Sequence, residues 1–84
     1  MKKITIYTKM LCPYCTGAKS LLAEKGQKFD EIDIGKKPEE RAVMIDRASG
    51  GYTVPQIFIG DHHVGGCDDL FALEKSGKLD ALLA

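Results

Sequence analysis

Two cysteines, Cys12 and Cys15, stand where an apolar strand gives way to an amphipathic helix. Residues three apart share one face of a helix, so the two sulfurs can meet in its first turn. Pro13 suits the first helical position, because its missing N–H would have no partner there. Cys12 then becomes the N-cap, where free backbone N–H groups and the positive end of the helix dipole favour the thiolate. This arrangement predicts a redox-active pair in which Cys12 is the nucleophile.

The second cysteine is predicted to be chemically different from the first. Cys15 lies one turn deeper in the helix, beside Ala18 and Leu22. We expect its thiol to be less exposed and to keep its proton until it resolves a mixed disulfide.

A zinc site is the alternative interpretation of this pair. His63 and Cys67 form an H-x3-C pattern downstream that would complete four ligands. A structural zinc half-site usually lies in a turn, whereas this pair opens a helix after a strand, so redox chemistry is favoured. The sequence after Met1 contains no signal-peptide core and no transmembrane run. We therefore expect the reducing cytoplasm, where paired cysteines are usually catalytic or metal-binding.

Composition limits the classes of partner. The 84 residues are 44% hydrophobic, which predicts one compact domain that folds without stabilising disulfides or metal ions. Twelve basic residues balance twelve acidic ones, so no overall field attracts nucleic acid or an anionic membrane. We expect a monomer that binds neither.

The hydrophobic pattern predicts an α/β fold with the order β-α-β-α-β-β-α. A parallel βαβ unit opens the chain, and Gly60-Asp61 is a type II′ turn that joins an antiparallel hairpin. Gly77 is a candidate break in the last helix. The predicted strands cover residues 4–8, 29–34, 54–59 and 62–64, and the predicted helices cover residues 13–25, 38–48 and a final segment from Asp68.

Three motifs, in this order and at these separations, resemble a dithiol glutaredoxin of the small bacterial type over essentially the whole chain. They are Cys12-Pro13-Tyr14-Cys15 preceded by Tyr7-Thr8-Lys9, the segment Thr53-Val54-Pro55-Gln56-Ile57-Phe58-Ile59, and Gly65-Gly66-Cys67-Asp68-Asp69-Leu70. The resemblance implies one glutaredoxin domain over residues 1–84, with a thioredoxin-like fold: a four-stranded mixed sheet flanked by three or more helices. It implies glutathione as cosubstrate, with no tightly bound cofactor and no metal.

The resemblance also implies where glutathione binds. The proline that matches Pro55 is cis in glutaredoxins and faces the active-site cysteine, so Val54 would pair its N–H and C=O with the cysteinyl unit. The residues alone say less: Val54 is extended because it precedes a proline, and Pro55 cannot donate to the sheet. The full predicted glutathione-binding set is Lys9, Tyr14, Arg41, Thr53, Val54, Pro55, Gly66, Cys67 and Asp68.

The two ends of glutathione would meet charged groups. Gly65-Gly66 leads into a helix N-terminus, where the N–H groups of Cys67 and Asp68 would hold the γ-glutamyl carboxylate. The Asp68 side chain would pair with the ammonium, or it could merely cap the helix. Lys9 and Arg41 would meet the glycine carboxylate, Arg41 because it lies one turn before the buried stripe of its helix.

Three other residues receive less specific interpretations. Cys67 is either a small buried hydrophobe or, activated by the helix N-terminus, a second glutathionylation site. His62 and His63 are interpreted as surface residues. Many relatives carry a basic residue where this chain has Gly17, so glutathione affinity or thiolate stabilisation is expected to be weaker here.

The predicted function is reduction of glutathione mixed disulfides and protein disulfides. Cys12 attacks, and glutathione or Cys15 resolves the adduct. Glutathione reductase takes part only indirectly, through glutathione, and the protein partners are glutathionylated or disulfide-containing. The rivals are a glutaredoxin-like protein served by thioredoxin reductase, and a metal module that bridges an iron–sulfur cluster through Cys12 in a dimer or binds zinc through both cysteines.

Overall fold

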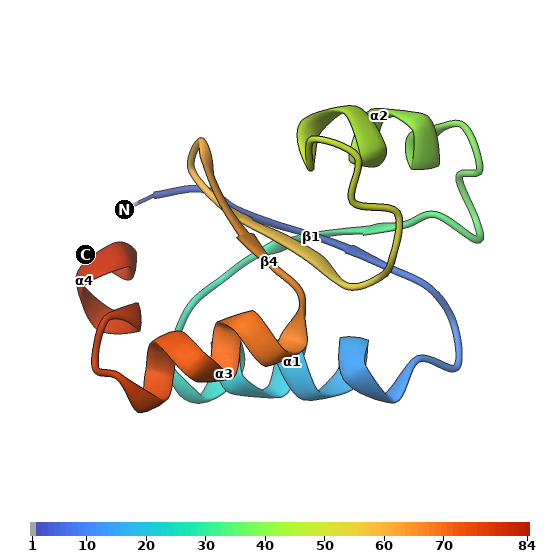
Figure 1. The fold of residues 1–84 in the computed structure, drawn as a ribbon. Helices are drawn as coiled ribbons and strands as arrows, with labels where there is room; N and C mark the ends of the chain where they lie inside the picture. Colours follow the sequence, from blue (N-terminus) through green and yellow to red (C-terminus); the bar gives the residue numbers. More distant parts are fainter. Residues whose placement is uncertain (1) are drawn as a thin grey trace.

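The structure is a computed structural model that describes residues 2–84. Its four strands form one mixed sheet in the order β2-β1-β3-β4 (Figure 1). Strand β1 is parallel to β2 and antiparallel to β3, and β3 is antiparallel to β4. The predicted fold class and element order are confirmed. The strands are β1 (Ile4–Thr8), β2 (Asp30–Asp33), β3 (Gln56–Ile59) and β4 (His62–Gly65).

Helices cover both faces of this sheet. Helices α1 and α3 lie together on one face, and α2 lies on the other (Figure 1). None of the helices within residues 2–84 is both long and apolar enough to cross a lipid bilayer. The helices are α1 (Pro13–Glu24), α2 (Glu40–Arg47), α3 (Cys67–Lys75) and α4 (Leu79–Leu83).

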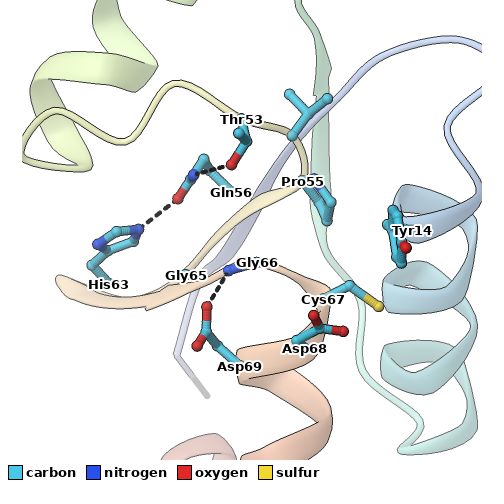
Figure 2. Close-up of a pocket in the computed structure, with 11 residues that line it drawn as sticks. Tyr14, Thr53, Pro55, Gln56, His63, Gly65, Gly66, Cys67, Asp68 and Asp69 are labelled. Carbon is cyan, nitrogen blue, oxygen red and sulfur yellow. Dashed lines mark hydrogen bonds between the residues drawn. The ribbon is translucent and has the colours of Figure 1, made fainter.

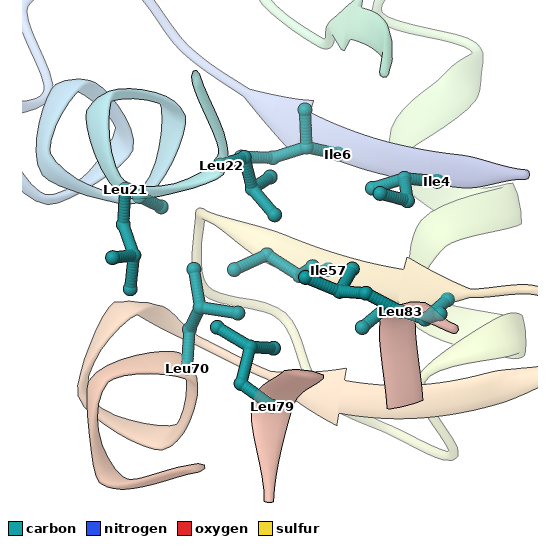
Figure 3. Close-up of a cluster of buried hydrophobic side chains, with 10 residues drawn as sticks. Ile4, Ile6, Leu21, Leu22, Ile57, Leu70, Leu79 and Leu83 are labelled. Atoms are coloured by element: carbon teal, nitrogen blue, oxygen red, sulfur yellow. The ribbon is translucent and has the colours of Figure 1, made fainter. Parts of the chain in front are cut away.

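The larger core fills the space between the sheet and helices α1, α3 and α4 (Figure 3). Strands β1 and β3 supply side chains to it from alternate positions, and their other positions face α2, so both strands are buried on both faces. The prediction that β3 is covered on both faces is confirmed. This core contains Ile4, Ile6, Ala18, Leu21, Leu22, Ile57, Ile59, Leu70, Leu79 and Leu83.

The main differences from the predicted element boundaries lie in α2, β3 and the last helix. Helix α2 begins at Glu40 and not at Pro38, because residues 37–41 form i→i+3 turn bonds before the helix proper. Strand β3 begins only after the cis Val54–Pro55 bond. The last helix starts at Cys67, ends at Lys75, and resumes as α4 after Gly77, whose φ of 78° cannot continue a helix. The break predicted at Gly77 is therefore confirmed.

The hairpin and the bulge after it aim the chain at the functional site. Gly60, with φ of 59°, opens the predicted two-residue turn, and Ile59 pairs with His62. The register then shifts, because Phe58 pairs with His63 but Ile57 pairs with Gly65. Such a bulge bends its strand and changes the direction of the chain beyond it. Here it directs the chain into α3, whose N-terminus comes to lie beside α1.

Candidate active site

Cys12 occupies the N-cap of α1, as predicted. Its backbone is extended, with φ of −112° and ψ of 102°, and Pro13 follows at the first helical position. The sulfur accepts a hydrogen bond from the backbone N–H of Cys15 at 3.2 Å. It also lies 3.9 Å from the carbonyl oxygen of Val54, which is distant in the sequence. The reactive sulfur therefore sits between a helix N-terminus and the start of β3.

Cys15 is buried, with 2% of its surface exposed. Burial raises the pKa of its thiol to about 12, and the hydrogen bond and charge of Cys12 act in the same direction. Cys15 is therefore protonated at neutral pH. The prediction that Cys15 is less exposed than Cys12 is confirmed.

A groove of about 490 Å³ includes Val54, whose carbonyl oxygen lies near the Cys12 sulfur, and its lining is shown in Figure 2. One wall is the segment that leads into β3, and the other is the N-terminus of α3, with Tyr14 of α1 at one end. The groove gathers most of the predicted glutathione-binding residues: Tyr14, Thr53, Val54, Pro55, Gly66, Cys67 and Asp68.

The N-terminus of α3 leaves Asp68 free to face this groove. The N-cap is Gly66, and its backbone N–H donates to the Asp69 carboxylate at 2.9 Å. Gly65 has φ of 110°, and a Cβ there would collide with that carboxylate. Asp68 is exposed and makes no capping bond. The alternative that Asp68 merely caps the helix is therefore wrong, since Asp69 has that role.

The remaining two predicted residues lie elsewhere. Lys9 borders a second hollow, of about 610 Å³, on the side of Cys12 that faces β2. Arg41 is exposed on α2 and lines neither space. Its contact with the glycine carboxylate stays a prediction.

Four groove residues lie outside the predicted set: Gln56, His63, Gly65 and Asp69. Gln56 is 5% exposed, and its amide donates to the Thr53 hydroxyl at 3.4 Å while its oxygen lies 2.7 Å from Nε2 of His63. The His63 ring stacks on Phe58, with ring centroids 4.9 Å apart. His63 is exposed, as predicted, but it is also part of the groove wall. The available signal was Gln56 itself, the one polar residue within an apolar run.

No metal centre is assembled by these residues. Within residues 2–84, no three side chains of histidine, cysteine, aspartate or glutamate lie close enough together to hold a metal ion. His63, the predicted zinc partner, is engaged by Gln56.

Comparison with known proteins identifies the family. The glutaredoxin family model matches residues 4–64. The chain belongs to the glutaredoxin family. It is 58% identical over 84 residues to a glutaredoxin of Pseudomonas aeruginosa, which covers 100% of this chain and 99% of that protein. It is 54% identical over 83 residues to glutaredoxin 3 of Escherichia coli strain K12, which covers 99% of each.

Solved structures agree with this assignment. The solution structure of glutaredoxin from Brucella melitensis is 61% identical, with a TM-score of 0.85, and covers 99% of this chain and 89% of that one. A buckwheat glutaredoxin–glutathione complex is 29% identical, with a TM-score of 0.88. The match covers 98% of this chain and 76% of the buckwheat chain. The fold is thioredoxin-like, and the protein is a glutathione-dependent thiol–disulfide oxidoreductase.

Cys67 is not an activated thiol, although it opens a helix. Burial raises the pKa of its thiol, and the charges of Asp68 and Cys12 add to that shift. Its sulfur points toward α1 in Figure 2 and lies 3.6 Å from the place where a Cβ of Gly17 would stand. These observations favour the other interpretation, in which Cys67 packs as a half-buried side chain between α1 and α3.

Replacing Gly17 by alanine should stabilise the protein. Gly17 lies within α1, where glycine costs about 1 kcal/mol relative to alanine. The added methyl group would meet the Cys67 sulfur at 3.6 Å, an ordinary contact. We expect Tm to rise by roughly 4–8 °C in a calorimetric scan.

The control for this prediction is Gly26→Ala. Gly26 has φ of 70° and open space around it, so alanine there meets only backbone strain and should lower Tm. If Gly17→Ala also lowered Tm, the contact between Gly17 and Cys67 would be tighter than the structure describes.

Proposed function

We propose that residues 1–84 act as one glutaredoxin domain, a cytoplasmic monomer in which Cys12 is the attacking thiolate and Cys15 the resolving thiol. The observation that supports this most directly is the position of the Cys12 sulfur. It lies at a helix N-terminus, 3.9 Å from the carbonyl oxygen of Val54, a residue that lines the groove of about 490 Å³. The buried, protonated Cys15 is one turn away.

For a glutathionylated protein, the Cys12 thiolate attacks the glutathione sulfur of the mixed disulfide. A Cys12–glutathione disulfide forms, and the protein leaves as a thiolate that takes up a proton. A second glutathione thiolate then attacks the bound glutathione sulfur, which releases oxidised glutathione and restores the Cys12 thiolate. Glutathione reductase returns oxidised glutathione to the reduced pool, so it serves this protein only indirectly.

For a protein disulfide, Cys12 first forms a mixed disulfide with one substrate sulfur. Cys15 loses its proton and attacks the Cys12 sulfur, which releases the substrate as a dithiol and leaves a Cys12–Cys15 disulfide. Two glutathione molecules reduce that disulfide. The hydrogen bond from Cys15 N–H to the Cys12 sulfur, 3.2 Å long, places the two groups in one helical turn, as this step requires.

The groove supports a specific orientation of glutathione. Its cysteinyl backbone would pair with Val54, and its γ-glutamyl carboxylate would accept from the N–H groups of Cys67 and Asp68. Asp68 would bind the ammonium, while Lys9 and Arg41 would bind the glycine carboxylate. The buckwheat relative was solved as a complex with glutathione and shares this fold, which supports the assignment.

Replacing Asp68 by asparagine tests this orientation. Asp68 is exposed and makes no capping bond, so the only expected effect on Tm is a small fall from loss of its negative charge in the first turn of α3. Loss of a charge-assisted contact with the ammonium should raise KM for a small glutathione mixed disulfide about fivefold, with little change in kcat.

Asp61→Asn is the matched control, because Asp61 is equally exposed, its replacement removes the same charge, and it lies in the hairpin turn away from both spaces. Its KM should stay at the wild-type value. An unchanged KM in Asp68→Asn would remove Asp68 from the glutathione site.

A further inference from the structure

Two large apolar side chains stand in solvent directly before the attacking cysteine. In the loop between β1 and α1, Leu11 is 95% exposed and Met10 is 66% exposed. Leu11 also has φ of 60°, in the left-handed region that a leucine rarely adopts. The loop therefore holds an apolar side chain out in water in a backbone conformation that leucine disfavours. Such local strain beside a reactive group points to a role in function.

The position of this pair relative to Cys12 narrows that role. Met10 and Leu11 border the second hollow, which Cys12 also lines, whereas the groove on the other side contains Val54 and the N-terminus of α3. When glutathione fills that groove, as the proposed function requires, the space there is taken. The protein that carries the other half of the disulfide must then lie over another part of the rim around Cys12. Met10 and Leu11 are the large apolar side chains of that rim, next to Pro13.

The charges of the second hollow add a restriction on the partner. Glu31 is held by Lys19 at 3.0 Å and by the Thr8 hydroxyl at 2.7 Å. The Asp33 carboxylate accepts from the backbone N–H groups of the turn after β2. The hollow has two other charged groups, Lys9 and Lys36, and neither belongs to an ion pair among residues 2–84. The proposed function assigns Lys9 to the glycine carboxylate of glutathione, which leaves Lys36. The positive charge of Lys36 therefore disfavours a basic partner segment.

We propose that Met10 and Leu11 form a docking surface for protein substrates, and that it binds an apolar side chain next to the cysteine of a non-basic substrate segment. This rests on the proposed function, because it concerns the protein half of the same mixed disulfide. Contact with Leu11 removes apolar surface of both molecules from water. The surface thus favours substrates by their flanking residues, while glutathione binding is common to all of them.

The test uses two peptides glutathionylated on a single cysteine, identical except that leucine flanks the cysteine in one and serine in the other. Turnover of each peptide is measured with glutathione and glutathione reductase. The mixed disulfide of glutathione and free cysteine is assayed in parallel as a third, small substrate. We expect wild type to favour the leucine peptide about fivefold in kcat/KM. A double variant, Met10→Ser with Leu11→Asn, should lose that preference and keep its rate on the small mixed disulfide.

The substitutions are chosen to leave the loop intact. Asparagine tolerates the left-handed region, so Leu11→Asn changes the side chain and not the backbone, and Tm should not fall. Val43→Ser is the control, because Val43 is an exposed apolar residue of α2 that lines neither space, and its preference should match wild type.

The outcomes separate the two proposals. Equal rates of wild type on the two peptides, or an unchanged preference in the double variant, would overturn the docking surface while small-substrate turnover upholds the proposed function. An equal loss of kcat/KM by the double variant on all three substrates would also overturn the docking surface, since Met10 and Leu11 would then support the reaction centre itself. Failure of wild type on the small mixed disulfide would overturn the proposed function itself.

Discussion

Cys12→Ser should abolish every exchange reaction of this protein. A serine hydroxyl is a nucleophile only beside a base that removes its proton, and no base serves that position. The histidine of the groove wall, His63, is engaged by Gln56 and stacked on Phe58. We expect the rate on glutathione mixed disulfides and on protein disulfides to fall on the order of a thousandfold or more, to the uncatalysed background.

The rate is measured by coupling the formation of oxidised glutathione to NADPH consumption by glutathione reductase. A measurement of Tm shows that the variant is folded. Cys67→Ser is the matched control: Cys67 has a raised thiol pKa and should be dispensable, so this variant should keep most of the activity. Activity in folded Cys12→Ser, lost when Cys67 is also replaced, would transfer the nucleophilic role to Cys67.

Cys15→Ser should separate the two reactions of the site. The cycle on glutathione mixed disulfides never uses the resolving thiol, so its rate should stay within a few-fold of wild type. Reduction of protein disulfides needs attack on the Cys12 sulfur from within the protein and should be largely lost. The variant should accumulate as a glutathione adduct about 305 Da heavier than the free protein, the mass added by this exchange.

The raised pKa of Cys15 explains why resolution waits for the adduct. Burial is its largest cause, but the hydrogen bond and the charge of Cys12 contribute. Both of these contributions disappear when the Cys12 sulfur becomes part of a disulfide, so the pKa of Cys15 falls as the mixed disulfide forms. Cys15 is thus protonated in the resting enzyme and becomes easier to deprotonate when it is needed.

Mass spectrometry of the intact protein and parallel assays on the two substrate types check this prediction. Cys15→Ala is a second variant, because Cys15 is buried and alanine avoids placing a hydroxyl in the core. If both variants stay folded and are as inactive as Cys12→Ser on small glutathione mixed disulfides, glutathione is not the natural partner. The interpretation as a glutaredoxin-like protein that receives electrons from thioredoxin reductase would then replace the glutathione-dependent one.

Local sequence was enough to predict the elements that carry the reaction. The N-cap position of Cys12 depends on Pro13 and on the strand before it, all within a few residues. The turn at Gly60 and the break at Gly77 depend on single glycines with positive φ. Such features arise from the chemistry of neighbouring residues, so a sequence without a structure predicts them well.

Features that depend on register or on packing were not predictable in this way. The contact of Gln56 with His63 requires the shifted pairing of β3 with β4. The raised pKa of Cys67 requires that α3 pack on α1 at Gly17, which has no side chain to hold it away. Helix periodicity placed Arg41 near the site, yet the arginine of α2 that contacts the core is Arg47, whose guanidinium lies 4.3 Å from the centroid of the Phe58 ring.

The sequence by itself determined that two unequal cysteines open a helix after a strand, because that inequality arises within one helical turn. Only the tertiary structure decided what those cysteines face. Val54 is 42 residues from Cys12, and the antiparallel pairing of β3 with β1 brings its carbonyl to 3.9 Å from the Cys12 sulfur. That pairing is fixed by burial of both strands on both faces, a property of the whole core that no short segment contains.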